Sequence, residues 1–385
     1  MNPLFSFKIY NTVQDIPADW DILAQKNIFL SRDYLRILET AAPQNMSCCF
    51  IALFHKQEII GICISQFLNL SQIPSFGERD HCLRTKIRNF VFKKFGSKVL
   101  IIGNNMFTGQ NGIALSKKHP KTSLVKLLKQ VSNALENLYQ KQGNKPHLTI
   151  FKDFSEIQIK NFDVPEFDSF YRFSTQPNMI FNIKNSWETF DNYLADLNKK
   201  YRDQYKRARK KSDSLHKQKM SLSEIQNHEK EIHSLYMNVA EKAPFNTFYL
   251  GENHFEIFKK NLKDHFLFYG YFEENKLIGF NTLIKNGNDI DTYFLGYSED
   301  CQKEKMLYLN MLYDMIGYSI NKKYKRIIFA RTALEIKSSV GAQAVEMYGL
   351  IKHNNAFLNL FVAKTFHYFE PKLEWQARNP FKEVN

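Results

Sequence analysis

Three side chains that could take part in acid–base chemistry follow a short apolar segment. Residues 326–330 (RIIFA) predict a buried strand, and Arg331, Glu335 and Lys337 come directly after it. The carboxyl end of a strand commonly opens into a ligand site, where a carboxylate can take a proton and cations can hold an anionic group. If the segment is helical, Arg331 and Glu335 are i,i+4 neighbours on one face. An Arg–Glu helix pair beside an exposed Lys337 fits equally well, so both interpretations stay open.

Two tyrosines and an asparagine flank the polar segment 298–306 (SEDCQKEKM). A tyrosine hydroxyl can protonate a leaving thiolate or ribose oxygen, so Tyr308 is a candidate proton donor. Tyr297 and Asn310 are candidate substrate ligands. The chain holds 19 tyrosines, and ordinary packing in a core or at its rim is the competing interpretation.

A strongly basic run occupies residues 199–211 (KKYRDQYKRARKK), with eight Lys or Arg residues and one Asp. An apolar stripe at helical spacing predicts a helix that docks on the protein through one side; its members are Leu194, Leu197, Tyr201, Tyr205 and Ala208. Arg202 and Lys206 lie on an adjacent face. We expect these two to bind an anionic part of a substrate, and Lys210 and Lys211 to be solvated. A wholly solvated face and a grip on nucleic acid are the alternatives.

A second basic segment, residues 83–98 (LRTKIRNFVFKKFGSK), has six Lys or Arg residues and no acidic one. Its apolar residues would share one face of a helix. This pattern suits contact with an anionic membrane surface or an acidic carrier protein. An ordinary docked surface helix explains it as well.

Composition bounds the class of protein. The 385 residues suggest two domains, and a hydrophobic fraction of 44% is enough to form hydrophobic cores. No apolar run is long enough for a membrane-spanning helix, and no signal peptide is indicated. The five cysteines have neither a framework spacing nor a zinc spacing, so we expect reduced thiols, no metal, and a cytoplasmic protein with peripheral contact at the inner membrane as an open alternative.

The elements that position these residues recur in two halves. In residues 20–154, helical segments precede a predicted hairpin (47–70), a buried strand (98–104), a helix (124–140) and a strand (147–154). Residues 186–330 repeat helices, a meander of strands, a helix and a strand in the same order. The pattern predicts two α/β (α+β) domains of similar build, at residues 1–165 and 166–385.

Four segments resemble one known family. They are residues 190–211 (FDNYLADLNKKYRDQYKRARKK), the meander at 269–298, residues 329–342 (FARTALEIKSSVGA) and residues 101–115 (IIGNNMFTGQNGIAL). Together they resemble the tandem-GNAT, FemAB-like acyltransferases, in the BioF2-like or peptidoglycan biosynthesis/recognition branch. The resemblance implies two GNAT-like domains, each with a mixed central sheet flanked by helices, and most of the substrate site in the second. It also places the family's lysine at Lys337.

The resemblance further implies direct transfer of an acyl or aminoacyl group to an amine, without a covalent enzyme intermediate. The donor would be acyl-CoA, an acyl carrier protein or an aminoacyl-tRNA, and Tyr297, Tyr308 and Asn310 would flank its reacting end. Many GNAT proteins hold the CoA pyrophosphate on a Gly-rich loop, but residues 298–306 contain no glycine. A conventional acetyl-CoA cradle is therefore not expected in the second domain.

The resulting prediction is an N-acyltransferase or aminoacyltransferase whose acceptor is an amine of a cell-envelope precursor or lipid. Glu335, Lys337 and Tyr308 are its candidate catalytic residues. Its candidate substrate-binding residues are Arg331, Arg202, Lys206, Tyr297 and Asn310. Two alternatives are a non-catalytic nucleic-acid-binding protein that uses the 199–211 helix, and a degenerate GNAT domain that serves as a binding scaffold.

Overall fold

The computed structural model describes residues 4–73, 92–243, 246–369 and 375–382. The chain forms two compact units. Unit 1 comprises Met1–Thr175, Pro244–Leu250 and Glu346–Lys372, and unit 2 comprises Gln176–Ala243, Gly251–Val345 and Leu373–Asn385. Contiguous domains meeting at residue 165 were expected. The observed division differs because the chain returns to unit 1 after residue 345.

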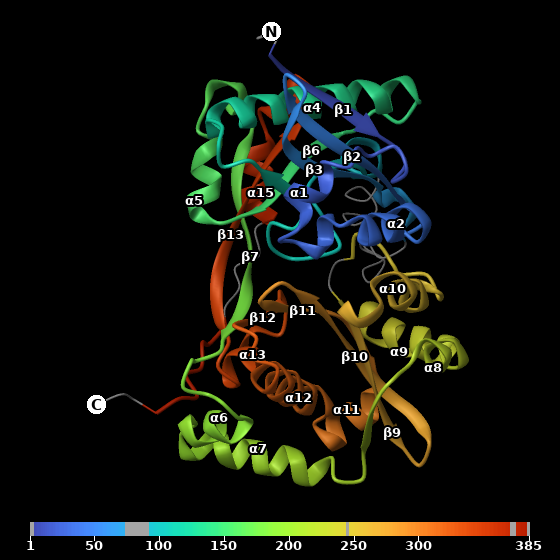
Figure 1. Cartoon of the computed structure of the whole chain (residues 1–385), viewed down its shortest axis with the longest axis vertical. Helices are drawn as coiled ribbons and strands as arrows, with labels where there is room; N and C mark the ends of the chain where they lie inside the picture. Colours follow the sequence, from blue (N-terminus) through green and yellow to red (C-terminus); the bar gives the residue numbers. More distant parts are fainter. Residues whose placement is uncertain (1–3, 74–91, 244–245, 370–374, 383–385) are drawn as a thin grey trace. The chain divides into compact units, whose positions relative to one another are not determined.

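Unit 1 is built on a mixed sheet whose strands follow the order β1-β2-β3-β4-β6-β13, with β5 paired to β3 (Figure 1). The strands are β1 (Phe5–Tyr10), β2 (Met46–His55), β3 (Glu58–Asn69), β4 (Lys98–Ile102), β5 (Ile113–Leu115), β6 (Leu148–Phe154) and β13 (Gln343–His353). Strands β4 and β6 are parallel, and β13 pairs with β6 in antiparallel register. The last strand of the chain therefore extends the sheet begun by its first residues.

Helices cover the sheet of unit 1. They are α1 (Trp20–Ala24), α2 (Arg32–Thr40), α4 (Lys121–Lys141), α5 (Glu156–Ile159), α14 (Ala356–Asn359) and α15 (Val362–Phe369). Helix α4 packs on the strands because Leu124, Leu128, Val131 and Leu135 recur every three or four residues and are fully buried. This confirms the helix predicted from residue 124 to residue 140.

The strands of unit 2 follow the order β7-β12-β11-β10-β9-β8. They are β7 (Tyr171–Asn182), β8 (His216–Lys219), β9 (Phe266–Glu273), β10 (Lys276–Asn286), β11 (Asp289–Tyr297) and β12 (Arg326–Ala330). Strands β11 and β12 are parallel, and the other neighbours are antiparallel. Strand β12 has the bounds predicted for the RIIFA segment.

The helices of unit 2 lie on both faces of its sheet (Figure 1). They are α6 (Phe190–Asp196), α7 (Lys199–Lys211), α8 (Leu222–Asn227), α9 (Glu229–Ala240), α10 (His254–Leu262), α11 (Glu299–Lys305), α12 (Leu307–Asn321) and α13 (Leu334–Ser339). Helices α6, α7 and α12 share one apolar core with strands β7 and β12. On the other side, Phe255 of α10 packs edge-on against Phe268 and Phe280 of β9 and β10.

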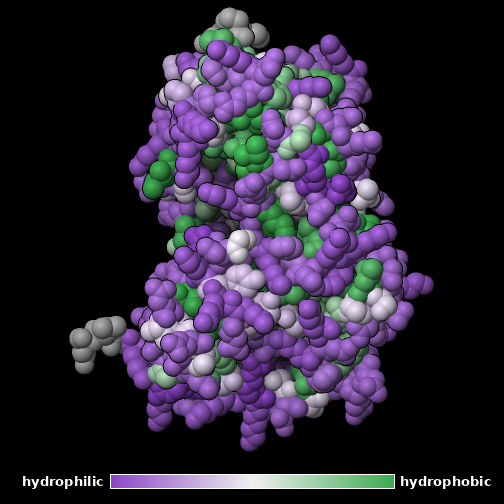
Figure 2. All heavy atoms as spheres, viewed as in Figure 1, coloured by the Kyte–Doolittle hydropathy of each residue, from purple (hydrophilic) through white to green (hydrophobic). Residues whose placement is uncertain are grey.

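Most of the face seen in Figure 2 is hydrophilic, with separate hydrophobic groups between the polar side chains. Among the described residues, no helix combines the length and the apolar character needed to cross a bilayer. The α/β class predicted from the sequence is confirmed. Of the predicted basic helix at 83–98, residues 92–95 are helical, and residues 83–91 lie outside the described residues.

Candidate active site

The parallel strands β11 and β12 are paired over only part of their length. Their register runs from Asp289 opposite Arg326 to Asp291 opposite Ile328, and β11 then continues for six residues to Tyr297. The register between β10 and β11 shifts over the same stretch, so that Tyr293 and Phe294 together face one residue of β10. This is a β-bulge, which bends a strand and commonly lies beside a functional site. The two strands thus stop pairing near their carboxyl ends, and ligands commonly bind at the carboxyl ends of parallel strands.

Strand β12 ends in a turn with an unusual backbone. Ala330, Thr332 and Ala333 have φ angles of 59°, 66° and 47°, in the left-handed region that residues with a Cβ atom rarely adopt. Three such residues within four positions carry a conformational cost of order 1–3 kcal/mol each. Such backbone strain concentrates at functional sites, where surrounding contacts must hold it in place.

Lys337 makes those contacts. The side chain is only 4% exposed, and its Nζ donates to the carbonyl oxygens of Phe329 (2.6 Å), Arg331 (2.6 Å) and Ala330 (3.3 Å). Burial lowers the pKa of the amine to about 7. The three carbonyl oxygens favour a higher pKa, because they accept hydrogen bonds best from an ammonium group. Lys337 therefore places a buried amine, with a lowered pKa, at the end of β12.

Arg331 and Glu335 do not pair with each other. Helix α13 begins at Leu334, so Arg331 precedes it and the prediction that the two share a helix face is wrong. The Nε of Arg331 donates to the carbonyl oxygen of Gln176 at 3.1 Å. Glu335 is exposed and accepts from Arg378 at 2.8 Å, a hydrogen bond that lowers the pKa of the carboxyl group. Glu335 is thus an ionised group in an ion pair, and its role as a base stays a prediction.

Tyr297 and Tyr308, which flank the polar segment 298–306, lie close together. Tyr297 ends β11, Tyr308 lies in the first turn of α12, and their ring centroids are 6.5 Å apart. Burial raises the pKa of both hydroxyls, so each keeps its proton at neutral pH. Asn310 is buried, and its Nδ2 donates to the carbonyl oxygens of Ala208, Lys305 and Met306. Its donor group joins α12 to α7, and its role in substrate binding is untested.

The basic helix α7 docks as its apolar stripe predicts. Tyr201 and Ala208 are buried in the core of unit 2, and the half-buried Arg202 donates to the carbonyl oxygen of Leu197. Arg209 pairs with Asp314 of α12 at 2.7 Å. Lys206 is exposed. Whether Arg202 and Lys206 meet a substrate stays a prediction.

The sequence pattern missed a buried pair at the bulge. His254, 1% exposed on α10, lies with its Nε2 2.9 Å from the hydroxyl of Tyr293 in β11. The two residues are far apart in the sequence and belong to no motif. Only the folded chain shows that they are in contact. The parallel strands of unit 1 end in another buried polar pair, in which the Nζ of Lys152 lies 2.7 Å from a carboxylate oxygen of Asp153.

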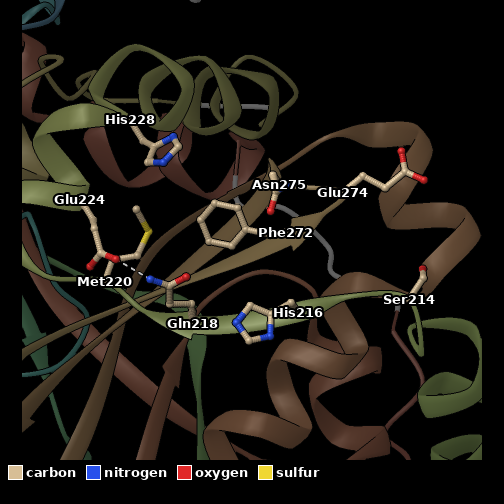
Figure 3. A pocket seen from close by; sticks show the side chains of 9 residues that line it. All are labelled: Ser214, His216, Gln218, Met220, Glu224, His228, Phe272, Glu274 and Asn275. Carbon is tan, nitrogen blue, oxygen red and sulfur yellow. Dashed lines mark hydrogen bonds between the residues drawn. The ribbon is translucent and has the colours of Figure 1, made fainter.

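A hollow of about 320 Å³ lies elsewhere in unit 2, beside the edge strand β8 (Figure 3). Its lining includes His216, Gln218, Glu224, His228 and Phe272, and the amide of Gln218 donates to the carboxylate of Glu224. None of the candidate site residues lines it. In the part of the chain that the structure describes, no group of three or more His, Cys, Asp or Glu side chains could hold a metal ion.

Parallel strands that separate beside a bulge, with a helix following the longer strand, define the class of GNAT-fold proteins. A sequence profile of the FemAB-like family, described as peptidoglycan biosynthesis/recognition, matches residues 12–364. The chain therefore belongs to the FemAB-like family, and the resemblance found in its sequence is confirmed. Membership of this family, together with a GNAT-like fold, supports an acyltransferase.

Two solved structures show the same fold at low sequence identity, and a third, FemX, matches less closely. A tandem GNAT protein from the clavulanic acid biosynthesis pathway has a TM-score of 0.52 at 8% identity, over 91% of this chain and 99% of that one. L-PGS from Bacillus licheniformis has a TM-score of 0.50 at 10% identity, over 92% and 97%. FemX has a TM-score of 0.49 at 11% identity, over 85% and 97%. A comparison with curated proteins found no match.

Proposed function

We propose that the protein transfers an acyl or aminoacyl group from a thioester or an aminoacyl-tRNA to an amine of a cell-envelope precursor or lipid. Membership of a family described by peptidoglycan biosynthesis/recognition supports this class of acceptor. The observation that carries the proposal is the separation of β11 from β12 at Asp291 and Ile328, with the Lys337 amine buried at the end of β12. That arrangement leaves backbone groups and one buried amine, protonated in part at neutral pH, beside a place where a carbonyl group can lie.

The proposed reaction is a direct displacement. The acceptor nitrogen forms a bond to the donor's carbonyl carbon, and the bond from that carbon to the donor's sulfur or oxygen breaks. Glu335 would take the proton that the amine loses, and Tyr308 would give a proton to the leaving group. In its protonated form, Lys337 would contribute positive charge near the oxyanion that forms on the carbonyl oxygen. Arg331, Arg202 and Lys206 would hold anionic parts of the substrates.

The residues after β11 do not fit a CoA pyrophosphate. Helix α11 begins with Glu299 and Asp300, and residues 298–306 contain no glycine that would let a phosphate approach the backbone. Glu299 pairs with Lys242 and Lys303, so carboxylates and their partners already occupy the place where the helix dipole would attract an anion. This supports a donor bound through other groups, and favours aminoacyl-tRNA or an acyl carrier protein over free acyl-CoA.

Donor consumption tests the proposal. The protein would be incubated with labelled acyl-CoA, acyl carrier protein and aminoacyl-tRNA in turn, each with an amine acceptor from a cell-envelope extract. We expect loss of label from one donor and its appearance in an amide. Replacing Lys337 by Met should slow that transfer by roughly 100-fold or more, since it removes the protonated form of the amine beside the oxyanion. If no donor is consumed by the intact chain, the proposal is wrong.

The nucleic-acid alternative required free tyrosine rings on α7. Tyr201 is buried, and Tyr205 packs edge-on against Phe190 and Tyr313 with the guanidinium of Arg209 over its ring. These contacts oppose base stacking on either ring. Without stacking, the helix offers charge alone, which does not favour this alternative over the acyltransferase.

A further inference from the structure

An apolar surface of unit 1 is turned toward solvent just after its last strand. Phe357, Leu360 and Phe361 are 67%, 74% and 45% exposed. They lie three and four residues apart in a continuous series of helical turns, with hydrogen bonds from Leu360 N to Phe357 O and from Phe361 N to Leu358 O. The rings of Phe357 and Phe361 are 5.4 Å apart. Three large apolar side chains therefore share one outward face.

Polar side chains of the same segment are used to hold it down. Asn355 accepts from Leu358 N at the start of α14. Asn359 accepts from His353 N and donates to Ser169 O, both at 2.8 Å. In this segment Asn359 and Val362 are turned toward the protein, whereas the two aromatic rings are turned outward. Hydrogen bonds that involve five residues thus hold this segment in place, and the exposed apolar side chains belong to a segment that is attached to the rest of unit 1.

A third exposed aromatic residue, Phe95, is tied to this face. His353 donates through Nε2 to the carbonyl oxygen of Phe95 at 2.8 Å, and its Nδ1 accepts from Asn355 N at 2.9 Å. Phe95 is 40% exposed, and the exposed Lys93 and Lys94 precede it. The Nζ of Lys94 lies 5.4 Å from the centre of the Phe95 ring.

Within the two segments that carry the apolar side chains, the charge has one sign. Lys364 is exposed and lies four residues after Leu360, on the same face as the three apolar residues. Residues 92–98 and 353–369 contain four lysines and no Asp or Glu; the first acidic residue after them is Glu370. Aromatic and aliphatic tips surrounded by lysines are typical of segments that lie in the headgroup region of an anionic bilayer.

We propose that Phe95, Phe357, Leu360 and Phe361, with Lys93, Lys94 and Lys364, form a docking surface for an anionic lipid bilayer. The apolar side chains enter the boundary between headgroups and acyl chains, and the lysines contact the anionic headgroups. A second copy of the chain fits poorly, because a two-fold contact through this face would bring its lysines against their own copies. This inference stands on the surface alone and does not need the transfer activity.

Vesicle flotation with the full chain tests it. The probes are vesicles of phosphatidylcholine, with and without phosphatidylglycerol. We expect binding only to the vesicles that contain phosphatidylglycerol. The triple variant Phe357→Ser/Leu360→Ser/Phe361→Ser should bind them roughly tenfold more weakly or worse. Ile22→Ser is the matched control, since Ile22 is 65% exposed in α1 of the same unit, and it should bind like the unaltered chain.

Charge is tested separately. Each lysine near an anionic surface contributes roughly a fivefold change in affinity, so Lys93→Gln/Lys94→Gln should weaken binding by about 25-fold. The matched control is Lys117→Gln/Lys118→Gln, which removes two exposed lysines from another part of unit 1. Equal binding by the unaltered chain and both patch variants, or no binding by the unaltered chain, overturns the proposal. So does a dimer of the unaltered chain that the triple variant converts to a monomer, because the occupant would then be a second copy.

Discussion

At the scale of single residues, two buried groups beside the separating strands are held near the point of ionisation. Lys337 has its pKa lowered to about 7 by burial, and Asp291 has its pKa raised to about 7, mainly by burial. Asp291 lies at the last pair of the β11–β12 ladder, and Lys337 contacts the carbonyls at the end of β12. Both groups therefore make the stability of this part of unit 2 depend on pH near neutrality.

For Lys337 the sign follows from proton counts. Between pH 7 and about 10, the unfolded chain holds the lysine proton and the folded chain has lost it, so the free energy of unfolding rises with pH in this range. In Lys337→Met that rise should disappear. The variant should also be less stable, by about 1–3 kcal/mol, because three buried carbonyl oxygens lose their donor. Denaturant unfolding at a series of pH values measures both. An equal pH slope in the two proteins would show that the amine titrates normally.

Asp291 should act in the opposite direction. Between about pH 4 and pH 7 the folded chain holds a carboxyl proton that the unfolded chain has lost, so stability falls as pH rises through this range. Asp291→Asn keeps an acceptor for the Asn286 amide, which lies 3.1 Å away, and removes the titration. At pH 8 the variant should be more stable by roughly 2–4 kcal/mol. Unfolding curves that coincide at pH 8 would contradict this.

At the scale of elements, the turn between β12 and α13 determines where the site residues lie. The sequence predicted strand β12 and the short helix after it, but placed Arg331 on that helix. Ala330, Thr332 and Ala333 adopt left-handed backbone conformations that no propensity assigns to alanine or threonine. Those residues shift the helix start to Leu334 and separate Arg331 from Glu335. Buried contacts of Lys337 impose this turn, and a local pattern cannot show them.

The strain in this turn can be measured. Ala333 has φ 47° and ψ 41°, so Ala333→Gly should relieve the crowding of its Cβ atom and raise the free energy of unfolding by about 1 kcal/mol. Ala195→Gly is the matched control. Ala195 is exposed in α6, where glycine should instead lower stability by about 0.5–1 kcal/mol. If both substitutions destabilise equally, the turn at Ala333 is not strained.

At the scale of the whole molecule, the order of the helices and strands could be predicted from the sequence. The unit to which each of them belongs could not. The periodic apolar residues of α4 and of the buried strands predicted helices and strands correctly, because hydrophobic spacing reports local burial. Nothing in the sequence of β13 indicates which strand it pairs with. Pairing between Leu350 and Phe151 joins residues about two hundred positions apart, and only the folded chain reveals it.

A fragment test follows from that pairing. Residues 1–165 contain strands β1 to β6 but lack β13, which supplies buried Leu350 and Ile351 beside β6. We expect this fragment to lack a cooperative unfolding transition by circular dichroism. Adding a peptide of residues 343–369 should restore part of the transition, while a peptide of the same composition in scrambled order should not. A fragment that unfolds cooperatively alone would show that β13 is dispensable.

The return of β13 to unit 1 also has a consequence for the order of events on the ribosome. The ribosome synthesises residues 1–175 of unit 1 before it reaches unit 2, and the segments 244–250 and 346–372 of unit 1 follow later. During the synthesis of some 170 further residues, at about 5–20 residues per second, strand β6 waits with one edge open. An open edge of a sheet recruits other strands. We therefore expect the nascent chain to depend on holding chaperones over this interval, and slow translation of unit 2 to lower the yield of folded protein.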